Sequence, residues 1–298
     1  METIKTIFDL GEAGYMMYHY FYLQWRKENE ETPPPIQIFT LPDRTRVYER
    51  NLANIIRTDL PEELLDDSLV RNSFLYNNME EIPFEYVMKA CKVNKEEVVS
   101  PWKNLDWKNY KWYGKKQLIK PFVSHDFEIE SYNKMKNEID KSKKNIVLFP
   151  RYKKGSNYML FRNWSFERWD RLIKLLVDET DFNVIICGKK GQTFPVKHYK
   201  GRTLGLVTKD PFPMIITALN DDNTILTACS QSFGGKLSLL QNVDTIMWGH
   251  QRHRHQVEEN WSGDNTVCSF IEDEDYIIYP EDVFEIIKHH LKVKEEEK

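Results

Sequence analysis

The chain has 298 residues, of which 41% are hydrophobic and 30% are charged, with a formal net charge of -4. This composition is that of a globular protein with one large or two medium domains, and its slight acidity gives no overall attraction to nucleic acid or anionic lipid. No apolar run reaches the roughly 18 residues that a membrane-spanning helix needs, so we expect neither a nucleic-acid partner nor an integral membrane segment.

The cysteines and the first residues indicate where the protein resides. Four cysteines lie far apart and form no Cys-x-x-Cys pair: Cys91, Cys187, Cys229 and Cys268. In a chain of this length they indicate reduced thiols, and hence the cytoplasm, or the host cytoplasm for a viral protein. The opening METIKTIFDLGEAG does not have the layout of a signal peptide, because Asp9 and Glu12 interrupt its apolar part.

The first half of the chain alternates predicted strands and helices. Short apolar runs predict strands over 3–8 and 36–40. Helical spacing of the apolar residues predicts helices over 13–28 and 42–56. An order of strand, helix, strand and helix is typical of a parallel α/β sheet.

The turn between the first predicted strand and helix carries the sequence GEAG, residues 11–14. A carboxylate there can accept a proton from a substrate hydroxyl, and Gly11 and Gly14 leave room for a ligand beside Glu12. The same carboxylate can instead stabilise the positive end of its own helix, by about 0.3–1 kcal/mol. These residues alone leave both interpretations open.

The middle of the chain is less regular. The segment 102–116, WKNLDWKNYKWYGKK, interleaves aromatic and basic residues, which can stack on bases or sugar rings or simply pack as a loop. The charged, helical stretch 130–145 is the best candidate for a hinge between domains. We therefore expect one domain over 1–140 and a second over 141–298.

The second half repeats the α/β pattern more clearly. Apolar runs predict strands over 145–149, 183–187, 224–228 and 243–247. Helices are predicted over 166–179, over 211–220, after SQSFGG and over 281–293. Ser165 is the expected N-cap of the first of these helices. The pattern predicts a second unit of the parallel α/β type.

Each unusual motif of the chain follows a predicted strand. The motifs are GEAG (11–14), PRYKKG (150–155), GKKG (188–191), SQSFGG (230–235) and WGH (248–250). Ligands of open α/β sheets bind beyond the carboxyl ends of the strands. The motifs therefore predict a ligand site between the two domains.

SQSFGG has the features of a phosphate site. A helix that begins there leaves backbone N–H groups unpaired at its positive end. Gly234 and Gly235 permit close approach of a ligand. The hydroxyls of Ser230 and Ser232 can donate hydrogen bonds to phosphate oxygens. A capped helix start without a ligand is the alternative.

Positive charges follow two of the predicted strands. The loop after 145–149 contains Arg151, Lys153, Lys154 and Arg162. Cations suit a diphosphate, which an arginine can bind through two parallel hydrogen bonds, although such a loop can also be merely solvated. Gly188 and Lys189 open a tight loop after 183–187, where the lysine can reach phosphate or face water. The chain contains neither the dinucleotide fingerprint nor the P-loop motif.

His250, His253 and His255 form a histidine-rich stretch after the last predicted strand. Their spacing does not place three imidazoles on one helical face, and zinc needs at least three well-placed protein ligands. We therefore expect no metal site. Contact with a base, sugar or phosphate and a plain surface loop both remain open for this stretch.

Two long runs make up most of the second half of the chain: NIVLFPR…RNWSFERWDRLIKLLVDETDFNVIICGKKG (145–191) and TLGLVTKDPFPMIITALNDDNTILTACSQSFGGKLSLLQNVDTIMWGH (203–250). Together they resemble the C-terminal domain of heptosyltransferase-like GT-B glycosyltransferases. The stretch GEAGYMMYHYFYLQWRKE (11–28) is similar to the start of related bacterial and viral glycosyltransferases. The resemblance implies an α/β protein of the GT-B fold, with two Rossmann-like domains that face a central cleft and a last helix able to pack back on the N-terminal domain.

The resemblance also implies an activity. Such an enzyme transfers a sugar from a nucleoside-diphosphate sugar, bound by 141–298, to a hydroxyl of a glycan or glycoconjugate acceptor that faces 1–140. It implies inversion rather than retention, no metal, and no cofactor beyond the nucleotide-sugar co-substrate. The alternatives are a nucleotide-sugar epimerase or hydrolase of the same fold, and a non-catalytic protein that binds a nucleotide sugar or a glycan.

Motif positions in that family assign roles to individual residues. Glu12 would be the acidic catalytic base, and Gly11, Gly14 and Tyr15 would lie beside the acceptor. The donor-binding residues that the resemblance implies are Arg151, Lys154, Arg162, Gly188, Lys189, Ser230, Gln231, Ser232, Gly234, Trp248 and Gly249. The chain departs from the family pattern at Phe233, which is inserted before the glycine of the phosphate turn.

Overall fold

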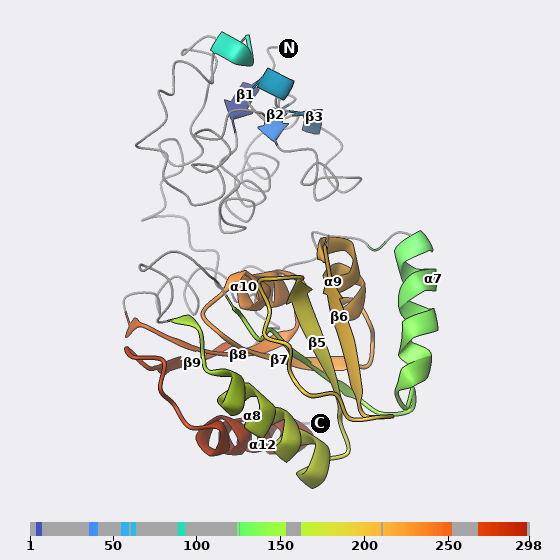
Figure 1. Cartoon of the computed structure of the whole chain (residues 1–298), viewed down its shortest axis with the longest axis vertical. Coiled ribbons are helices and arrows are strands. Elements are labelled where there is room, and N and C mark those ends of the chain that lie inside the picture. The colour runs from blue at the N-terminus through green and yellow to red at the C-terminus, as the bar shows by residue number, and fades with distance from the viewer. Residues whose placement is uncertain are drawn as a thin grey trace. The chain divides into compact units, whose positions relative to one another are not determined.

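The computed structural model describes residues 4–7, 36–40, 55–59, 61–63, 89–92, 124, 126–152, 162–209, 211–251 and 268–296. By compactness the chain divides into two units, Met1–Lys111 and Trp112–Lys298 (Figure 1). None of the helices in the described ranges is long and apolar enough to cross a membrane.

The first unit contains a parallel sheet of three strands in the order β1-β2-β3. The strands are β1 (Ile4–Ile7), β2 (Ile36–Thr40) and β3 (Ile55–Asp59). The strands expected over 3–8 and 36–40 are confirmed. The helix expected over 42–56 is wrong at its end, because Ile55 and Ile56 lie in β3 and pair with β2. Adjacent β-branched residues favour a strand, and a neighbouring strand completes that preference.

The second unit is built on a parallel sheet of six strands in the order β6-β5-β4-β7-β8-β9. The strands are β4 (Asn145–Leu148), β5 (Asn183–Lys189), β6 (Thr203–Thr208), β7 (Thr224–Ser230), β8 (Asp244–Gly249) and β9 (Cys268–Glu272). In chain order the arrangement reads 3-2-1-4-5-6, the order of the Rossmann fold. The strands expected in this half are confirmed as β4, β5, β7 and β8, whereas β6 and β9 were not expected.

Helices cover both faces of this sheet. They are α7 (Asp126–Met135), the 3-10 helix η4 (Lys136–Glu138), α8 (Phe166–Glu179), α9 (Phe212–Leu219), α10 (Phe233–Leu240) and α12 (Pro280–Glu296). Helices α8 and α12 lie on one face, and α9 and α10 lie on the other (Figure 1). As expected, α8 begins after Ser165, whose Oγ accepts a hydrogen bond from the Arg168 backbone N–H at 3.4 Å.

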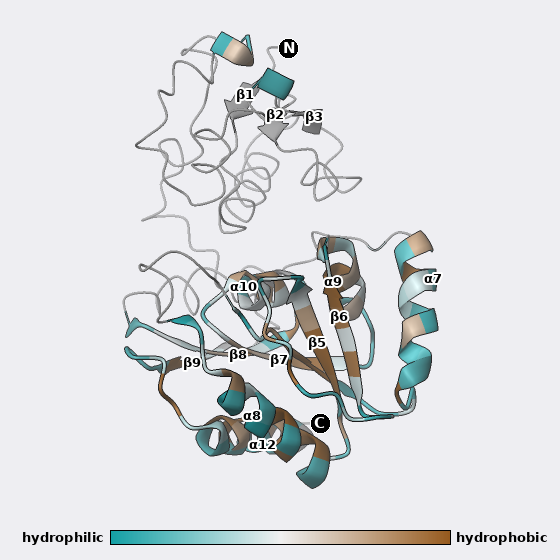
Figure 2. Cartoon of the chain, in the orientation of Figure 1, coloured by the Kyte–Doolittle hydropathy of each residue, from teal (hydrophilic) through white to brown (hydrophobic). Residues whose placement is uncertain are grey.

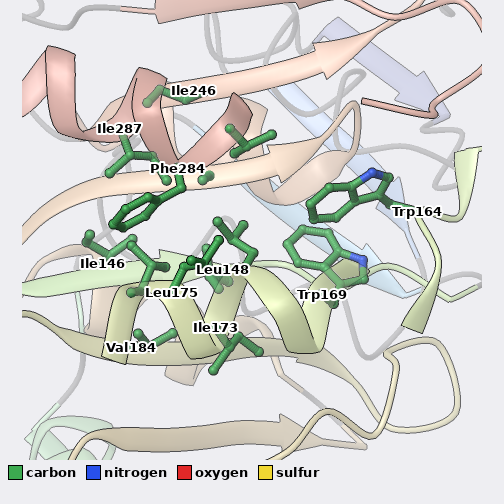
Figure 3. Packing of buried hydrophobic residues seen from close by; sticks show 14 of the residues in the cluster. Ile146, Leu148, Trp164, Trp169, Ile173, Leu175, Val184, Ile246, Phe284 and Ile287 are labelled. Atoms are coloured by element: carbon green, nitrogen blue, oxygen red, sulfur yellow. The ribbon is translucent and has the colours of Figure 1, made fainter. Parts of the chain in front are cut away.

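The core beneath α8 and α12 is apolar and closely packed. Phe284 and Ile287 of α12 face Ile146 and Leu148 of β4 (Figure 3), and these side chains are at most 2% exposed. The strands of this sheet are largely apolar, whereas the outer faces of α8 and α12 are polar (Figure 2). Burying one such side chain stabilises the fold by about 1.5–3 kcal/mol. The contacts of α12 in the described residues are thus with the second unit. The resemblance had implied that this helix can pack on the N-terminal domain.

The segment 130–145, which we expected to form a hinge, belongs to the second unit. Lys136 Nζ lies 2.5 Å from Asp221 Oδ2, and the Tyr132 hydroxyl donates to the same oxygen at 2.9 Å. Both side chains of the ion pair are only 10% exposed. This network, which we call the clamp, holds the segment against the turn before β7. The division between the compact units falls before Trp112, earlier than the boundary expected after residue 140.

Replacing Lys136 with methionine should destabilise the second unit strongly, because the Asp221 carboxylate then stays buried without its cation. We expect the free energy of unfolding, measured by urea denaturation, to fall by about 3–5 kcal/mol. The matched control is Lys134→Met, which breaks a solvent-exposed pair with Glu130 and should change that free energy by less than about 1 kcal/mol. Equal effects of the two substitutions would contradict the clamp.

Candidate functional site

The pairing of β4 with β7 marks the point where the strand order reverses. From β4 the chain crosses to β5 on one side, and from β7 it crosses to β8 on the other. In sheets of this order a ligand lies beyond the carboxyl ends of the two strands at that point. Arg151 follows β4 here, and Gln231 and Ser232 follow β7. The expectation that the motifs of the second half fall at strand carboxyl ends is confirmed for β4, β5, β7 and β8.

A buried hydroxyl without a partner stands at this edge of the sheet. Ser230, the last residue of β7, is 0% exposed, and within the described part of the chain its Oγ has no hydrogen-bond partner. Ser232 is the N-cap of α10, but its side chain forms no capping hydrogen bond to the helix. An unsatisfied buried hydroxyl destabilises a fold by about 1–3 kcal/mol. A ligand that accepts hydrogen bonds from Ser230 and from the start of α10 would remove that penalty.

Gly234 and Gly235 bring α10 close to the sheet. A Cβ on Gly234 would lie 2.3 Å from the Phe149 ring, and a Cβ on Gly235 would lie 2.3 Å from Met247 Cε. We expected these glycines to make room for a ligand, whereas the structure fills that room with side chains of the protein. Their effect on a ligand is therefore indirect, since they set how closely the positive end of α10 approaches the strand ends.

The residues after β4 are anchored by the turn after β5. Arg151 Nη1 donates to Asn163 Oδ1 at 2.9 Å, and the backbone of Arg151 forms a bridge with that of Thr193. Gly188 and Lys189 end β5 and lead into this turn. Arg151 and Lys189 are both partly buried, so two of the expected cations stand at the ends of neighbouring strands.

Tyr276, which no sequence signal had singled out, joins residues that follow β7 and β8. Its hydroxyl donates to Gln231 Oε1 at 2.9 Å, and both side chains are buried. Burial raises the pKa of this hydroxyl, against the opposing effects of the Arg162 guanidinium, the His250 backbone N–H and the Arg151 guanidinium. The tyrosine is therefore protonated at neutral pH, where it acts as a hydrogen-bond donor close to two positive charges.

Trp248 and Gly249, both expected to bind the donor, have different surroundings. Trp248 is 0% exposed, and its ring packs against those of Trp164 and Trp169 at centroid distances of 4.9 and 5.5 Å. Its side chain thus belongs to the core rather than to a ligand site. Gly249 lies at the edge, where an added Cβ would be 2.8 Å from Gln231 Cβ, so the absence of a side chain lets Gln231 lie against β8.

Several residues expected at the site lie outside the described residues. They are Gly11, Glu12, Gly14, Tyr15, Lys154, His253 and His255. Their roles stay predictions. Among the residues that the structure describes, no group of three or more His, Cys, Asp or Glu side chains is arranged to hold a metal ion.

Solved structures of glycosyltransferases share this fold. E. coli ADP-heptose LPS heptosyltransferase II matches with a TM-score of 0.63 and 12% sequence identity, over 99% of this chain and 100% of that chain. The glycosyl transferase family 9 protein from Veillonella parvula DSM 2008 gives a TM-score of 0.60 and 10% identity, over 95% of each chain. E. coli heptosyltransferase WaaC with ADP gives 0.53 and 9% identity, over 97% of this chain and 99% of that chain.

No protein-family model and no curated protein sequence matches the chain. The likeness to solved structures, at identities of 9–12%, establishes the fold. The chain has the α/β GT-B fold of the heptosyltransferases, as the motifs of its second half had indicated. The fold alone does not identify the activity, so the activity has to be inferred from the residues at the carboxyl ends of β4 and β7.

Cys229, on β7 beside Gly235, should be unreactive in the folded protein. Burial raises the pKa of its thiol to about 12, so almost no thiolate is present at about pH 8. We expect iodoacetamide at that pH to leave Cys229 unmodified in the native protein and to modify it fully in guanidinium chloride, as measured by peptide mass mapping. Rapid alkylation of Cys229 in the native protein would contradict the close packing of α10 on β7.

Proposed function

We propose that the chain is a glycosyltransferase that moves a sugar from a nucleoside-diphosphate sugar to a hydroxyl of a glycan or glycoconjugate. The donor diphosphate binds beyond the carboxyl ends of β4 and β7. One observation carries the proposal: at the switch point of a Rossmann sheet, the buried hydroxyl of Ser230, which has no partner among the described residues, adjoins the start of α10. E. coli heptosyltransferase WaaC, which shares the fold, binds ADP and ADP-2-deoxy-2-fluoro heptose in its solved structures, and this supports a nucleotide-sugar donor.

The charges at this edge suit the leaving group of such a reaction. As the bond from the anomeric carbon to the diphosphate breaks, negative charge grows on the departing nucleoside diphosphate. The hydroxyls of Ser230 and Ser232 and the first backbone N–H groups of α10 donate hydrogen bonds to that charge. Arg151 and Arg162 add positive charge beside it, and we expect Lys154 to do the same. Because the serines and the start of α10 are fixed by the fold, their donors stabilise the transition state more than the ground state, and the proposed transfer needs no metal ion.

The catalytic base in this proposal is Glu12. Its carboxylate takes the proton of the acceptor hydroxyl while the hydroxyl oxygen attacks the anomeric carbon from the face opposite the diphosphate. The new C–O bond forms as the old one breaks through an oxocarbenium-like state, so the anomeric configuration inverts. Gly11, Gly14 and Tyr15 lie beside the acceptor in this arrangement.

The buried thiols support our proposal for the setting of the reaction. Cys91, Cys187 and Cys229 are buried free cysteines, which agrees with a reducing compartment. We therefore place the reaction in the cytoplasm, or in the host cytoplasm for a viral protein, with a nucleotide sugar and a glycan as partners and no nucleic acid.

Ser230→Ala separates nucleotide binding from stability. Removing an unsatisfied buried hydroxyl should leave Tm unchanged or raise it, while the loss of one hydrogen bond to phosphate weakens nucleotide affinity by about 3- to 10-fold. Calorimetric titration with ADP, GDP, UDP and CDP measures the affinity. The control is Thr227→Val, which removes another buried hydroxyl of β7, away from the edge and likewise without a partner in the described ranges, and should leave the affinity unchanged.

Two results of that experiment would contradict the donor site. A nucleotide at 100 times its Kd stabilises the protein it binds by about 2.7 kcal/mol, so the site is wrong if none of the four raises the Tm of the unaltered protein. An equal loss of affinity in both variants would assign the effect to the strand rather than to the Ser230 hydroxyl.

Glu12→Gln should lower sugar transfer by at least about 100-fold, since a general base contributes about 10²- to 10⁴-fold, and should leave nucleotide affinity unchanged. The assay is the release of nucleoside diphosphate from a panel of nucleotide sugars in the presence of acceptor glycans. Asp9→Asn, which neutralises a neighbouring carboxylate, is the control. Unchanged transfer would remove Glu12 from the mechanism, and nucleotide binding without any turnover in the unaltered protein would favour the non-catalytic alternative.

A further inference from the structure

We propose that Tyr276 is a positioning residue, which orients the side-chain amide of Gln231 so that Gln231 Nε2 donates hydrogen bonds to the donor diphosphate. The inference rests on the proposed function. It adds to the donor site a residue from the loop between β9 and α12, which no motif of the chain indicates.

The hydrogen bonds of Gln231 fix which end of its amide faces the ligand. An amide side chain has an accepting oxygen and a nitrogen with two N–H donors. The Tyr276 hydroxyl donates to Gln231 Oε1 at 2.9 Å, while the His250 backbone N–H donates to the tyrosine oxygen. The backbone N–H of Gln231 is bound to the Trp248 carbonyl at 2.7 Å. With its oxygen held by Tyr276, the amide directs its N–H donors away from the tyrosine.

The position of Gln231 puts its N–H donors near the carboxyl ends of β4 and β7, where the donor diphosphate is proposed to bind. Its chain neighbours are Ser230, with the unpartnered buried hydroxyl, and Ser232, the N-cap of α10. A Cβ on Gly249 would lie 2.8 Å from Gln231 Cβ and 2.9 Å from the Tyr276 hydroxyl, so the pair fills the space beside β8. The backbone of Gln231 thus lies between two serines that can also donate to phosphate, and its amide is held beside Tyr276 and β8.

Tyr276 is itself held in an unfavourable backbone conformation. Its φ is 54°, a left-handed value that residues with a Cβ rarely adopt. The Asp273 carboxylate accepts from the backbone N–H groups of Ile277 and Ile278 at 2.9 and 3.0 Å, and Arg168 Nη1 donates to the Tyr276 carbonyl at 3.1 Å. Strained residues persist where the surroundings specify them, and they gather at functional sites.

A double-mutant cycle tests whether Tyr276 acts through Gln231. The proteins are the unaltered chain, Tyr276→Phe, Gln231→Ala and the double variant. Calorimetry measures affinity for inorganic pyrophosphate and for ADP, GDP, UDP and CDP, and Tm is recorded in parallel. We expect Tyr276→Phe to weaken binding by about 3- to 10-fold and to weaken it no further once Gln231 is alanine. Tyr279→Phe, at a tyrosine that is 67% exposed, is the control and should change nothing.

A second variant keeps the test informative if the alanine substitution disturbs the fold. Gln231→Glu retains an oxygen for the Tyr276 hydroxyl but replaces the N–H donors with a negative oxygen. Burial of the new carboxylate should lower the Tm, and pyrophosphate binding, measured well below that Tm, should weaken by more than about tenfold. Unchanged pyrophosphate affinity in this variant would overturn the inference.

The remaining outcomes separate the inference from the proposed function. If Tyr276→Phe leaves affinity unchanged, or weakens it equally with and without the Gln231 side chain, Tyr276 does not position Gln231 and the donor site itself stands. If the unaltered protein binds neither pyrophosphate nor any of the four nucleotides, the proposed function fails and the inference fails with it.

Discussion

The parallel pairing of β4 with β7 is the contact on which the second unit depends. Ile146 pairs with Leu226 and Leu148 with Ala228, and these side chains are fully buried. Because the chain leaves the two strands in opposite directions, α8 covers one face of the sheet and α10 covers the other. The loops after β4 and β7 consequently meet at one edge. The place of the candidate site is therefore a consequence of strand order rather than of any single residue.

Periodicity and local chemistry made much of this unit predictable. Helix α8 was predicted over its full length because its apolar stripe and the Ser165 cap agree, and β4, β5, β7 and β8 are short apolar runs with clear ends. Strand β6 was missed because Gly205 interrupts it, although the glycine is required there: a Cβ would lie 2.7 Å from the His198 ring. Ile55 and Ile56 were assigned to a helix because spacing and β-branching gave opposite indications, and pairing with β2 decided between them.

The site was predictable only where its residues directly follow an apolar strand. Arg151 and Ser230 were singled out in this way, and their roles in donor binding stay predictions. Tyr276 was not, because its bond to Gln231 joins residues 45 positions apart and depends on a left-handed turn that no pattern of apolar residues encodes. Trp248 was assigned to the donor by its motif position in the resembled family, and a tryptophan at a strand end has the same sequence pattern whether its ring enters the core or faces a ligand. Contacts between distant segments decide such cases, and a single sequence does not contain them.

The most direct test of a donor site at the β4–β7 edge is a crystal structure of the protein with a bound nucleoside diphosphate. We expect the diphosphate oxygens to lie about 2.7–3.2 Å from Ser230 Oγ, from the first backbone N–H groups of α10 and from Gln231 Nε2, with the Tyr276 hydroxyl still bound to the Gln231 oxygen. A diphosphate bound away from the carboxyl ends of β4 and β7, with the Ser230 hydroxyl still unpartnered, would contradict the site on which the proposed activity depends.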